Sequence, residues 1–546
     1  MIKDLKVRIK ETLNDALRTV AGCEQVEESE ISVLPSTKPE FGDYYTNVAL
    51  RCAREKRLPI NQLASELANS IFRIKPDFIE KVEIKNGFLN FFIRESVYFD
   101  FVKDIHESAG SVLQSHKTIA KKVLVEFVSA NPTGPLTIAH GRQAAVGESL
   151  ARILKYVGCE VQKEYYLNDG GRQIHLLGQS LKARYLQLQG QQVSIPEEGY
   201  EGEYLLELAK ELTDVPVTDD GFFDRFASES ILNGIKKDLQ TFGVTFDRWV
   251  SESSFIKDGS VEKLIEELKK RGLLYFSDSC WWFKSSAYGD EKDRVVVKSD
   301  GSLTYFATDI AYHENKLKRG FGVLVNIIGP DHHGYIPRLK AAVKVLGGNP
   351  DDFIPIIVQL TTLYRGKEKL SMSTRKGQFI SLRQLIDEVG SDPAKFFFIF
   401  RKTDSHLDFD LELAKKKSLE NPVYYLQYAY VRMKHILRFA ETKGIDISDI
   451  NPDFSLLKEQ EEILIAKKMA SFIDTVETAA STYGVHLIAE YLLELAGVLH
   501  SYYQKHRVVN ENNTDVTSAR LVLINALFEV FSRCLKLLNI SLPETM

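Results

Sequence analysis

The sequence predicts an α/β protein in three parts: a parallel-sheet core, a smaller α+β region before it and an all-helical bundle after it. The chain has 546 residues, too many for one compact core, so about three or four domains are expected. Residues 121–128 form a short apolar run that leads through a tight loop into a helix, which is typical of a buried parallel strand. From about residue 415 onward, nearly every segment has apolar residues at helical spacing, which indicates a helical bundle.

The first region is predicted to span residues 1–107. Residues 1–22 repeat apolar side chains at helical spacing, and a second helix is expected over about 59–72. Residues 81–93 alternate like a strand, with Asn86-Gly87 as the turn. A change of composition over 108–121 indicates a linker.

The core region is predicted to span residues 118–365. After the strand at 121–128, a helix is expected from about His140 to Tyr156, and further strands at 161–167, 321–328 and 353–360. Strand, tight loop and helix open a nucleotide-binding α/β unit. Polar helices and loops over about 185–300 are interpreted largely as an insertion. A connecting segment, 366–414, precedes the bundle at 415–546.

The composition excludes several classes of protein. Hydrophobic residues make up 44% and charged residues 27% of the chain, and no apolar run approaches the roughly 18 residues that span a bilayer. Acidic residues near the N-terminus and the lack of an apolar signal region argue against a transit peptide or secretion. The five cysteines contain no CxxC pair, which favours buried thiols in a reducing cytoplasm over a zinc site.

The loop at 129–142 is the first candidate for phosphate chemistry. A glycine-bearing loop that enters a helix after a core strand presents backbone N–H groups, and with the helix dipole these suit a triphosphate. His140 and Arg142 would add donors. Neither GxGxxG nor the Walker A pattern is present, and by itself the loop could be only a proline-rich connection.

A second candidate is the basic segment 365–376. It carries Arg365, Lys367, Lys369, Arg375 and Lys376 against Glu368, so despite the net charge of −5 a polyanion has a local partner. A loop of this kind can close over a polyphosphate and stabilise departing pyrophosphate. Taken alone, this segment and the run Lys415, Lys416, Lys417 are each more often solvated surface than a binding site.

Together, in this order, the two loops resemble the HIGH and KMSKS signatures of class I aminoacyl-tRNA synthetases. The surrounding motifs are similar to one family, the arginyl-tRNA synthetases of bacterial type: FGDYYTNVAL (41–50), SANPTGPL–x3–HGR (129–142), YYLNDGGRQI (165–174), YFATDIAYHENKL (305–317), GPDHHGY (329–335), MSTRKG (372–377), NPVYYLQYAYVR (421–432) and the terminal LPETM. The resemblance runs from about residue 40 to the last residue. It implies a Rossmann-type catalytic domain, an N-terminal domain that contacts tRNA and a C-terminal anticodon-binding domain of the DALR type.

The resemblance also assigns an arginine site. Its residues are Glu126, Ser129, Asn131, Tyr305 and Asp309. Independently, a guanidinium with five donors is matched by carboxylates, which Glu126 and Asp309 supply. Tyr305 and Asp309 could otherwise be only the first turn of a helix.

The ATP site implied by the resemblance centres on the HIGH-type region, Ala130 to His140. Its residues are Thr137, Ala139, His140, Gly141, Asp331, His332, Met372 and Ser373, and the catalytic candidates are His140, Thr137, Arg375 and Lys376. ATP is expected to bind with Mg²⁺, and no protein-bound metal is expected, because Asp331, His332 and His333 are adjacent on one backbone. Two departures stand out: Thr137 and Ala139 replace a histidine and a glycine of HIGH, and residues 371–375 lack both lysines of KMSKS.

The tRNA-binding candidates lie in the bundle. They are Lys415, Lys416, Tyr424, Tyr428 and Arg432. Aromatic residues at helical spacing are usually core, whereas exposed ones stack on unpaired bases, and the sequence leaves both interpretations open. Arg520, in the segment SARL, is expected to order the bundle.

The predicted function is ATP-dependent formation of arginyl-adenylate and transfer of arginine to the 3′-terminal adenosine of tRNA(Arg). The protein is expected to be a cytoplasmic monomer that does not bind a membrane. Three alternatives are a catalytically weakened tRNA-binding relative, another adenylating enzyme on the same scaffold, and a synthetase with a different amino acid. The altered signatures keep the first of these open, although the intact Glu126, Asn131, Tyr305 and Asp309 argue against it. The helical bundle argues against the second, and the acidic pocket residues argue against the third.

Overall fold

The computed structural model describes residues 5–20, 26, 30–36, 38–57, 59–114, 121–212, 220–370 and 379–546. The chain divides into two compact units. Unit 1 comprises residues 1–114, 429–475 and 494–532, and unit 2 comprises residues 115–428, 476–493 and 533–546. The region predicted as one bundle, 415–546, is therefore shared between the two units. Among the described residues no helix is long and apolar enough to cross a membrane.

Unit 1 begins with an α+β region, as predicted. Its four-stranded antiparallel sheet has the order β1-β2-β4-β3, and the hairpin turns at Asn86 and Gly87, which both have positive φ. Leu5, Ile9, Leu13 and Leu17 are buried, which explains the spacing of the first helix. The elements are α1 (Leu5–Thr19), β1 (Leu34–Pro35), β2 (Tyr44–Thr46), α2 (Val48–Lys56), α3 (Ile60–Ile74), β3 (Ile79–Lys85), β4 (Phe88–Ile93) and α4 (Glu95–Glu107).

The core of unit 2 is a five-stranded parallel sheet with the order β12-β11-β5-β6-β7. Its strands are β5 (Lys122–Glu126), β6 (Glu160–Leu167), β7 (Arg248–Ser251), β11 (Val323–Ile328) and β12 (Phe353–Ile357). The chain moves outward from β5 first toward β7 and later toward β12, so the order reverses at β5. Ligands of such sheets bind outside the carboxyl ends of the strands at this reversal.

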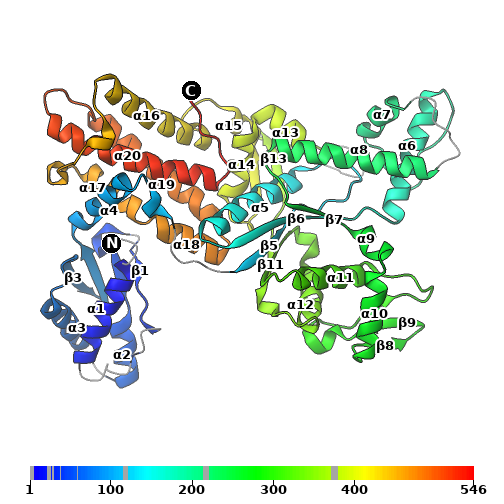
Figure 1. Ribbon diagram of the computed structural model, residues 1–546, viewed down its shortest axis with the longest axis horizontal. Coiled ribbons are helices and arrows are strands. Elements are labelled where there is room, and N and C mark those ends of the chain that lie inside the picture. Colours follow the sequence, from blue (N-terminus) through cyan, green and yellow to red (C-terminus); the bar gives the residue numbers. More distant parts are fainter. Residues whose placement is uncertain are drawn as a thin grey trace. The chain divides into compact units, whose positions relative to one another are not determined.

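Helices cover both faces of this sheet (Figure 1). Helix α5 (Ile138–Tyr156) lies on one face, and α11 (Tyr305–Lys318) and α12 (Ile336–Val345) lie on the other. Leu124 and Leu324 belong to the same buried cluster as Ile310 and Val343. Because side chains alternate along a strand, Glu126 lies on the same face as Leu124, toward α11.

The region from 172 to 297 contains mostly helices and one small antiparallel sheet, β10-β9-β8. Its elements are α6 (Arg172–Leu188), α7 (Glu203–Lys210), α8 (Asp220–Thr241), α9 (Glu252–Lys257), α10 (Ser260–Lys270), β8 (Leu274–Ser277), β9 (Cys280–Phe283) and β10 (Arg294–Val297). The expected insertion at 185–300 needs correction at one point. β7 lies within it and is an edge strand of the parallel sheet, paired with β6.

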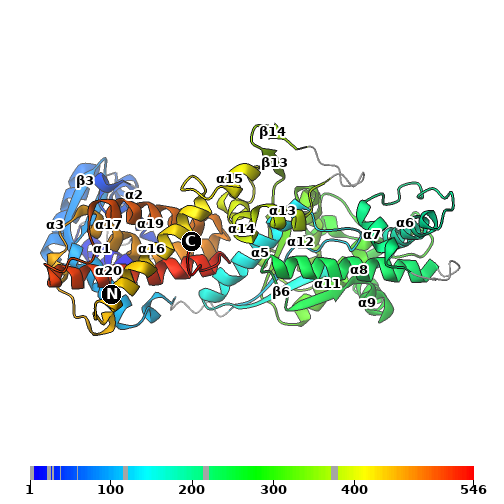
Figure 2. The same cartoon turned by 90° about the horizontal axis from the view of Figure 1, so that it is seen from above.

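Behind the sheet, a mixed three-stranded sheet has the order β14-β13-β15. Its neighbourhood comprises β13 (Thr361–Arg365), β14 (Glu368–Lys369), α13 (Leu382–Val389), α14 (Ser391–Phe400), β15 (Leu407–Asp410) and α15 (Leu411–Lys415). The remaining chain is helical, as predicted: α16 (Pro422–Thr442), α17 (Gln460–Ala470), α18 (Phe472–Thr482), α19 (His486–Lys505) and α20 (Thr514–Leu537), which Figure 2 shows from above.

Candidate active site

The site is built where β5 ends, at the reversal of strand order. Val128 and Ser129 both have positive φ, 68° and 42°, and a β-branched residue rarely adopts this conformation. The turn directs the Ser129 hydroxyl back to Oε1 of Glu126, to which it donates at 3.4 Å, and the Ser129 hydroxyl oxygen accepts the backbone N–H of Tyr166 at 3.1 Å. Strain of this kind at a strand end is typical of binding sites.

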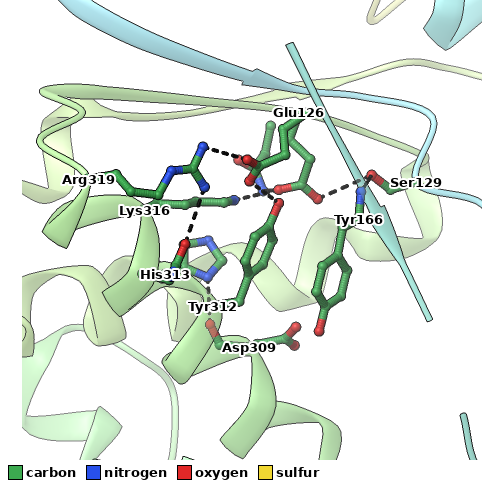
Figure 3. A network of polar contacts seen from close by, with 11 residues as sticks. Glu126, Ser129, Tyr166, Asp309, Tyr312, His313, Lys316 and Arg319 are labelled. Atoms are coloured by element: carbon green, nitrogen blue, oxygen red, sulfur yellow. Dashed lines mark hydrogen bonds and ion pairs between the residues drawn. The ribbon is translucent and has the colours of Figure 1, made fainter. Parts of the chain in front are cut away.

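Glu126 is already paired with a cation from within the protein. Lys316 of α11 brings its ammonium to 2.5 Å from Oε2 of Glu126, and Asn326 of β11 donates to the same oxygen at 3.2 Å (Figure 3). The Lys316 side chain is fully buried, and its ammonium lies 4.0 Å from the centre of the Tyr312 ring. The negative charge of Glu126 is therefore compensated before any ligand binds.

A second buried pair lies beside the first. Arg319 donates to Glu164 of β6 at 2.6 Å, and the Tyr312 hydroxyl donates to the other oxygen of Glu164 at 2.8 Å. Two carboxylates and two cations thus balance one another between the sheet and α11.

Two further carboxylates have no such partner. Asp309 of α11 accepts a hydrogen bond from the Tyr335 hydroxyl, and burial, reinforced by the charge of Glu126, raises its pKa to about 6. Glu252, the first residue of α9, is buried. Burial raises the pKa of Glu252 to about 7, and the charges of Asp309 and Asp169 add to this. Within the described chain, neither carboxylate forms an ion pair with a lysine or arginine.

Asn131 and Tyr305 lie at the margin of this cluster. The amide of Asn131 donates to Oε1 of Gln173 at 2.7 Å. Tyr305 is the first residue of α11 and is 58% exposed. Its hydroxyl lies 3.9 Å from where a Cβ on Gly171 would be. Neither side chain forms a hydrogen bond with Glu126 or Asp309 in the described part of the chain.

Thr137 and His140 form a pair at the start of α5. Thr137 is the N-cap residue, and both its backbone N–H and its hydroxyl lie 3.2 Å from Nδ1 of His140. Burial lowers the pKa of His140 to about 4, against a smaller opposing effect of Asp331. The imidazole is thus neutral at pH 7, and because Nδ1 accepts, its proton is on Nε2.

Two neighbours of His140 have structural roles. A Cβ on Gly141 would lie 2.8 Å from Leu382 and 3.1 Å from Phe398, so this glycine lets α5 pack closely on α13 and α14. Its N–H donates to the carbonyl of Thr137. Arg142 is fully buried, and its guanidinium donates to four backbone carbonyls, those of Phe398, Gln359, Ser405 and Lys402, at 2.9–3.4 Å. The expectation that Arg142 supplies a phosphate donor is wrong.

The other nucleotide candidates that the structure describes form none of these hydrogen bonds. Ala139 is exposed in the first turn of α5. Asp331 and His332 are exposed in the 3-10 segment Pro330–Tyr335, 3.5 Å apart. Met372, Ser373, Arg375 and Lys376 lie outside the described residues.

The lysines proposed to bind tRNA form ion pairs within the protein. Lys415 pairs with Glu412 at 2.7 Å and Glu388 at 3.1 Å, and Lys416 pairs with Glu420 at 2.5 Å. Arg365, counted above with the basic segment, also pairs with Glu388, at 2.6 Å. The local positive charge is therefore lower than the sequence count indicates.

The aromatic candidates lie on α16. The rings of Tyr424 and Tyr428 are half-buried and nearly parallel, 6.4 Å apart. In unit 1, the Arg432 guanidinium lies 3.7 Å over the ring of Tyr503. Arg520 donates to Glu462 of α17 at 2.7 Å and to the Arg507 carbonyl at 2.9 Å, which joins α20 to its neighbours as expected.

Sequence reasoning missed Glu252, Tyr166 and Lys316. Glu252 directly follows β7, so recognising 248–251 as a parallel strand would have placed it at the carboxyl edge of the sheet with Glu126. Tyr166 lies near the end of a strand that was predicted, on the same edge. For Lys316 the sequence offers no signal, because a lysine near a helix end is usually exposed.

Comparisons with known proteins agree with this architecture. Three family models match: the arginyl tRNA synthetase N terminal domain over residues 3–93, the catalytic domain of class I (R) tRNA synthetases over 102–397, and the DALR anticodon binding domain over 426–546. An arginine–tRNA ligase of Syntrophotalea carbinolica is 41% identical over 99% of this chain and 100% of its own length. One from Desulfovibrio desulfuricans is 43% identical over the same shares.

Solved structures share the fold. The arginyl-tRNA synthetase of Thermus thermophilus superposes with a TM-score of 0.77 at 21% identity, covering 99% of this chain and 100% of that one. The arginyl-tRNA synthetase of Plasmodium falciparum gives 0.75 at 16% identity, covering 99% of each chain.

Proposed function

The chain belongs to the arginyl-tRNA synthetase family, and from that premise we propose how its residues carry out the reaction. The protein is an arginine–tRNA ligase: it forms arginyl-adenylate from arginine and ATP and then transfers arginine to the terminal adenosine of tRNA(Arg). No observation favours the catalytically weakened alternative.

We propose that Asp309 and Glu252 bind the guanidinium of arginine. The observation that supports this is that neither carboxylate forms an ion pair with a lysine or arginine in the described chain. Glu126 and Glu164 are balanced by Lys316 and Arg319. In contrast, the half-buried Asp309 and the buried Glu252 form no ion pair in the described chain and have raised pKa values of about 6 and about 7. A buried carboxylate in this state is stabilised by an arriving cation. A guanidinium can satisfy two carboxylates at once because it has five donors in one plane.

Glu126 and Ser129, on the opposite side of the cluster, are proposed to hold the amino-acid end of the substrate, with Asn131 and Tyr305 at the margin. The carboxylate of arginine then points toward the start of α5. Ser129 is fixed by Tyr166 and Glu126, so the position of its hydroxyl is set before binding.

The triphosphate of ATP is proposed to bind at the N-terminus of α5, where backbone N–H groups and the helix dipole favour an anion. The neutral His140 presents its Nε2–H as a donor, and Thr137 orients the ring through Nδ1. Ala139, Gly141, Asp331, His332, Met372 and Ser373 complete the site by family resemblance, with Arg375 and Lys376 facing the departing pyrophosphate. Mg²⁺ accompanies ATP, bound by the triphosphate oxygens, and neutralises part of their charge.

The reaction needs no nucleophile from the protein. An oxygen of the arginine carboxylate attacks the α-phosphorus, and pyrophosphate leaves. A hydroxyl of the terminal ribose then attacks the arginyl carbonyl, and AMP leaves. The protein contributes positioning and stabilisation of developing charge.

The tRNA is proposed to contact Lys415, Lys416, Tyr424, Tyr428 and Arg432. The proposed domain bounds are 1–107, 118–365, 366–414 and 415–546. We further propose that the protein acts in the cytoplasm, because ribosomes consume aminoacyl-tRNA there, and that it is a monomer. Sedimentation of the purified protein alone and with tRNA checks the monomer.

Asp309→Asn tests the arginine site. Loss of a charge partner at a desolvated pair costs about 2–5 kcal/mol, so the KM for arginine in tRNA aminoacylation should rise about 30-fold or more, with the KM for ATP changed far less. Glu314→Gln, on the same helix but paired with Lys318, is the matched control and should leave both constants unchanged. Equal effects of Asp309→Asn on the two substrates would make Asp309 structural.

A further inference from the structure

Tyr166 is held in place from two sides. Its ring stacks on that of Tyr312, with centres 4.2 Å apart and planes 13° apart, and its backbone N–H donates to the Ser129 hydroxyl. Lys316 lies over the other partner of this stack, Tyr312. The direction of the Tyr166 side chain is therefore fixed before any ligand arrives.

The hydroxyl at the end of this side chain is out of contact with solvent and has no hydrogen-bond partner. Neighbouring phenols differ. The Tyr165 hydroxyl donates to the carbonyl of Ala130 at 2.8 Å, Tyr312 donates to Glu164, and Tyr335 donates to Asp309. Buried hydroxyls are nearly always bonded, so an unbonded one calls for an explanation such as a missing ligand.

Carboxylates surround this hydroxyl. Besides burial, the charges of Asp309, Glu252 and Glu126 raise the pKa of Tyr166 well above its usual range. The phenol therefore keeps its proton and retains lone pairs that can accept. In Figure 3 the hydroxyl of Tyr166 points to the part of the cluster where the Asp309 side chain lies, and no hydrogen bond joins the two.

We propose that Tyr166 is a specificity-determining residue whose hydroxyl oxygen accepts an N–H of the substrate's guanidinium. The inference rests on the proposed arginine site. Asp309 and Glu252 together offer four carboxylate oxygens, which can bind either a guanidinium or an ammonium. A guanidinium has five N–H groups and an ammonium only three, so the additional acceptor favours arginine over an amino acid such as lysine.

Tyr166→Phe isolates the hydroxyl because it keeps the ring and its stack. In tRNA aminoacylation by the full-length protein, the KM for L-arginine should rise about 10-fold, with kcat and the KM for ATP within about twofold. The inhibition constant of L-lysine, as a competitor of arginine, should stay within about twofold. Tyr275→Phe, which removes a phenol bonded to Asp293 on the small antiparallel sheet, is the control and should change none of these constants.

Thermal unfolding separates this role from a structural one. Without substrate, Tyr166→Phe should keep or raise the Tm, because it removes a buried hydroxyl that lacks a partner, whereas Tyr312→Phe should lower it. With saturating arginine, the stabilisation of Tyr166→Phe should be smaller than that of the unchanged protein.

Three results would overturn the inference: an unchanged KM for arginine, equal losses of arginine and lysine binding, or a lower substrate-free Tm. Asp309→Asn in the same assays distinguishes a failure of the proposed arginine site from a failure of the role proposed for Tyr166. If it weakens arginine binding while Tyr166→Phe does not, the arginine site stands and the role of Tyr166 falls. If neither does, both fall.

Discussion

The ammonium of Lys316 lies 2.5 Å from the carboxylate of Glu126, and the lysine side chain is fully buried. The pair joins α11 to the end of β5, two of the elements that carry the proposed arginine site. It also means that the negative charge left for a ligand is that of Asp309 and Glu252.

Lys316→Met should therefore destabilise the protein strongly, because it leaves Glu126 buried without a cation. Breaking such a pair costs about 3–5 kcal/mol, measurable by urea unfolding followed by circular dichroism. Lys318→Met, on the same helix and in a partly exposed pair with Glu314, should cost less than about 1 kcal/mol. The double change Lys316→Met with Glu126→Gln should recover much of the loss. Similar losses for Lys316→Met and Lys318→Met would contradict the burial of this pair.

Arginine binding should weaken as the pH falls. The ligand-free pKa values of Asp309, about 6, and Glu252, about 7, are raised by burial, and a bound guanidinium favours the charged form of each. Binding thus releases protons below about pH 7, and the affinity falls as the pH is lowered through 7 and 6, approaching about tenfold per pH unit for each group that must ionise. Calorimetric titration with arginine from pH 8 to pH 5.5 measures this. Asp309→Asn should make the dependence shallower, and a constant affinity over the range would rule out these carboxylates.

Thr137→Val should slow adenylate formation modestly. The change removes the hydroxyl 3.2 Å from Nδ1 of His140 but keeps the backbone N–H that contacts the same atom, so the expected cost is about 1–2 kcal/mol. His140→Ala should cost more, because it removes the Nε2–H itself. Single-turnover formation of arginyl-adenylate with tRNA present measures both. An unchanged rate for Thr137→Val would leave Thr137 as a helix cap alone.

Arg142→Lys should change stability rather than ATP binding. A lysine cannot reach the four carbonyls that the guanidinium joins, and carbonyls left unsatisfied cost about 1 kcal/mol each, so we expect a loss of about 2–4 kcal/mol. The KM for ATP should change less than about threefold. A large rise in that KM with unchanged unfolding would return Arg142 to the phosphate site.

The altered HIGH signature has a structural counterpart. Where Thr137 stands, a side chain is needed that caps α5 and orients His140, and threonine does both. The lowered pKa of His140, the second histidine of the signature, leaves its imidazole neutral at pH 7 in the ligand-free protein, which suits the proposed role as a donor.

The sequence by itself determined the family and many of the elements, and it supplied most of the residues of the proposed site. The helix spacing of Leu5 to Leu17, the turn at Asn86-Gly87 and the apolar run before Glu126 are local signals, because each depends on residues within one or two turns or on one strand. The helix α5 and the strands β5, β6, β11 and β12 were accordingly predicted within a few residues of their bounds, whereas α11 was not predicted as a helix.

Only the tertiary structure decided what these residues are joined to. The sequence could not show that Glu126 is neutralised by a residue 190 positions away, that Arg142 serves four carbonyls more than 200 positions away, or that Glu252 lies beside Asp309. Sequence periodicity reports which face of an element is buried, but the charge balance of a site depends on which buried groups meet. That is fixed by the packing of α9 and α11 on the sheet, which leaves two carboxylates without an ion pair and one phenol without a hydrogen-bond partner.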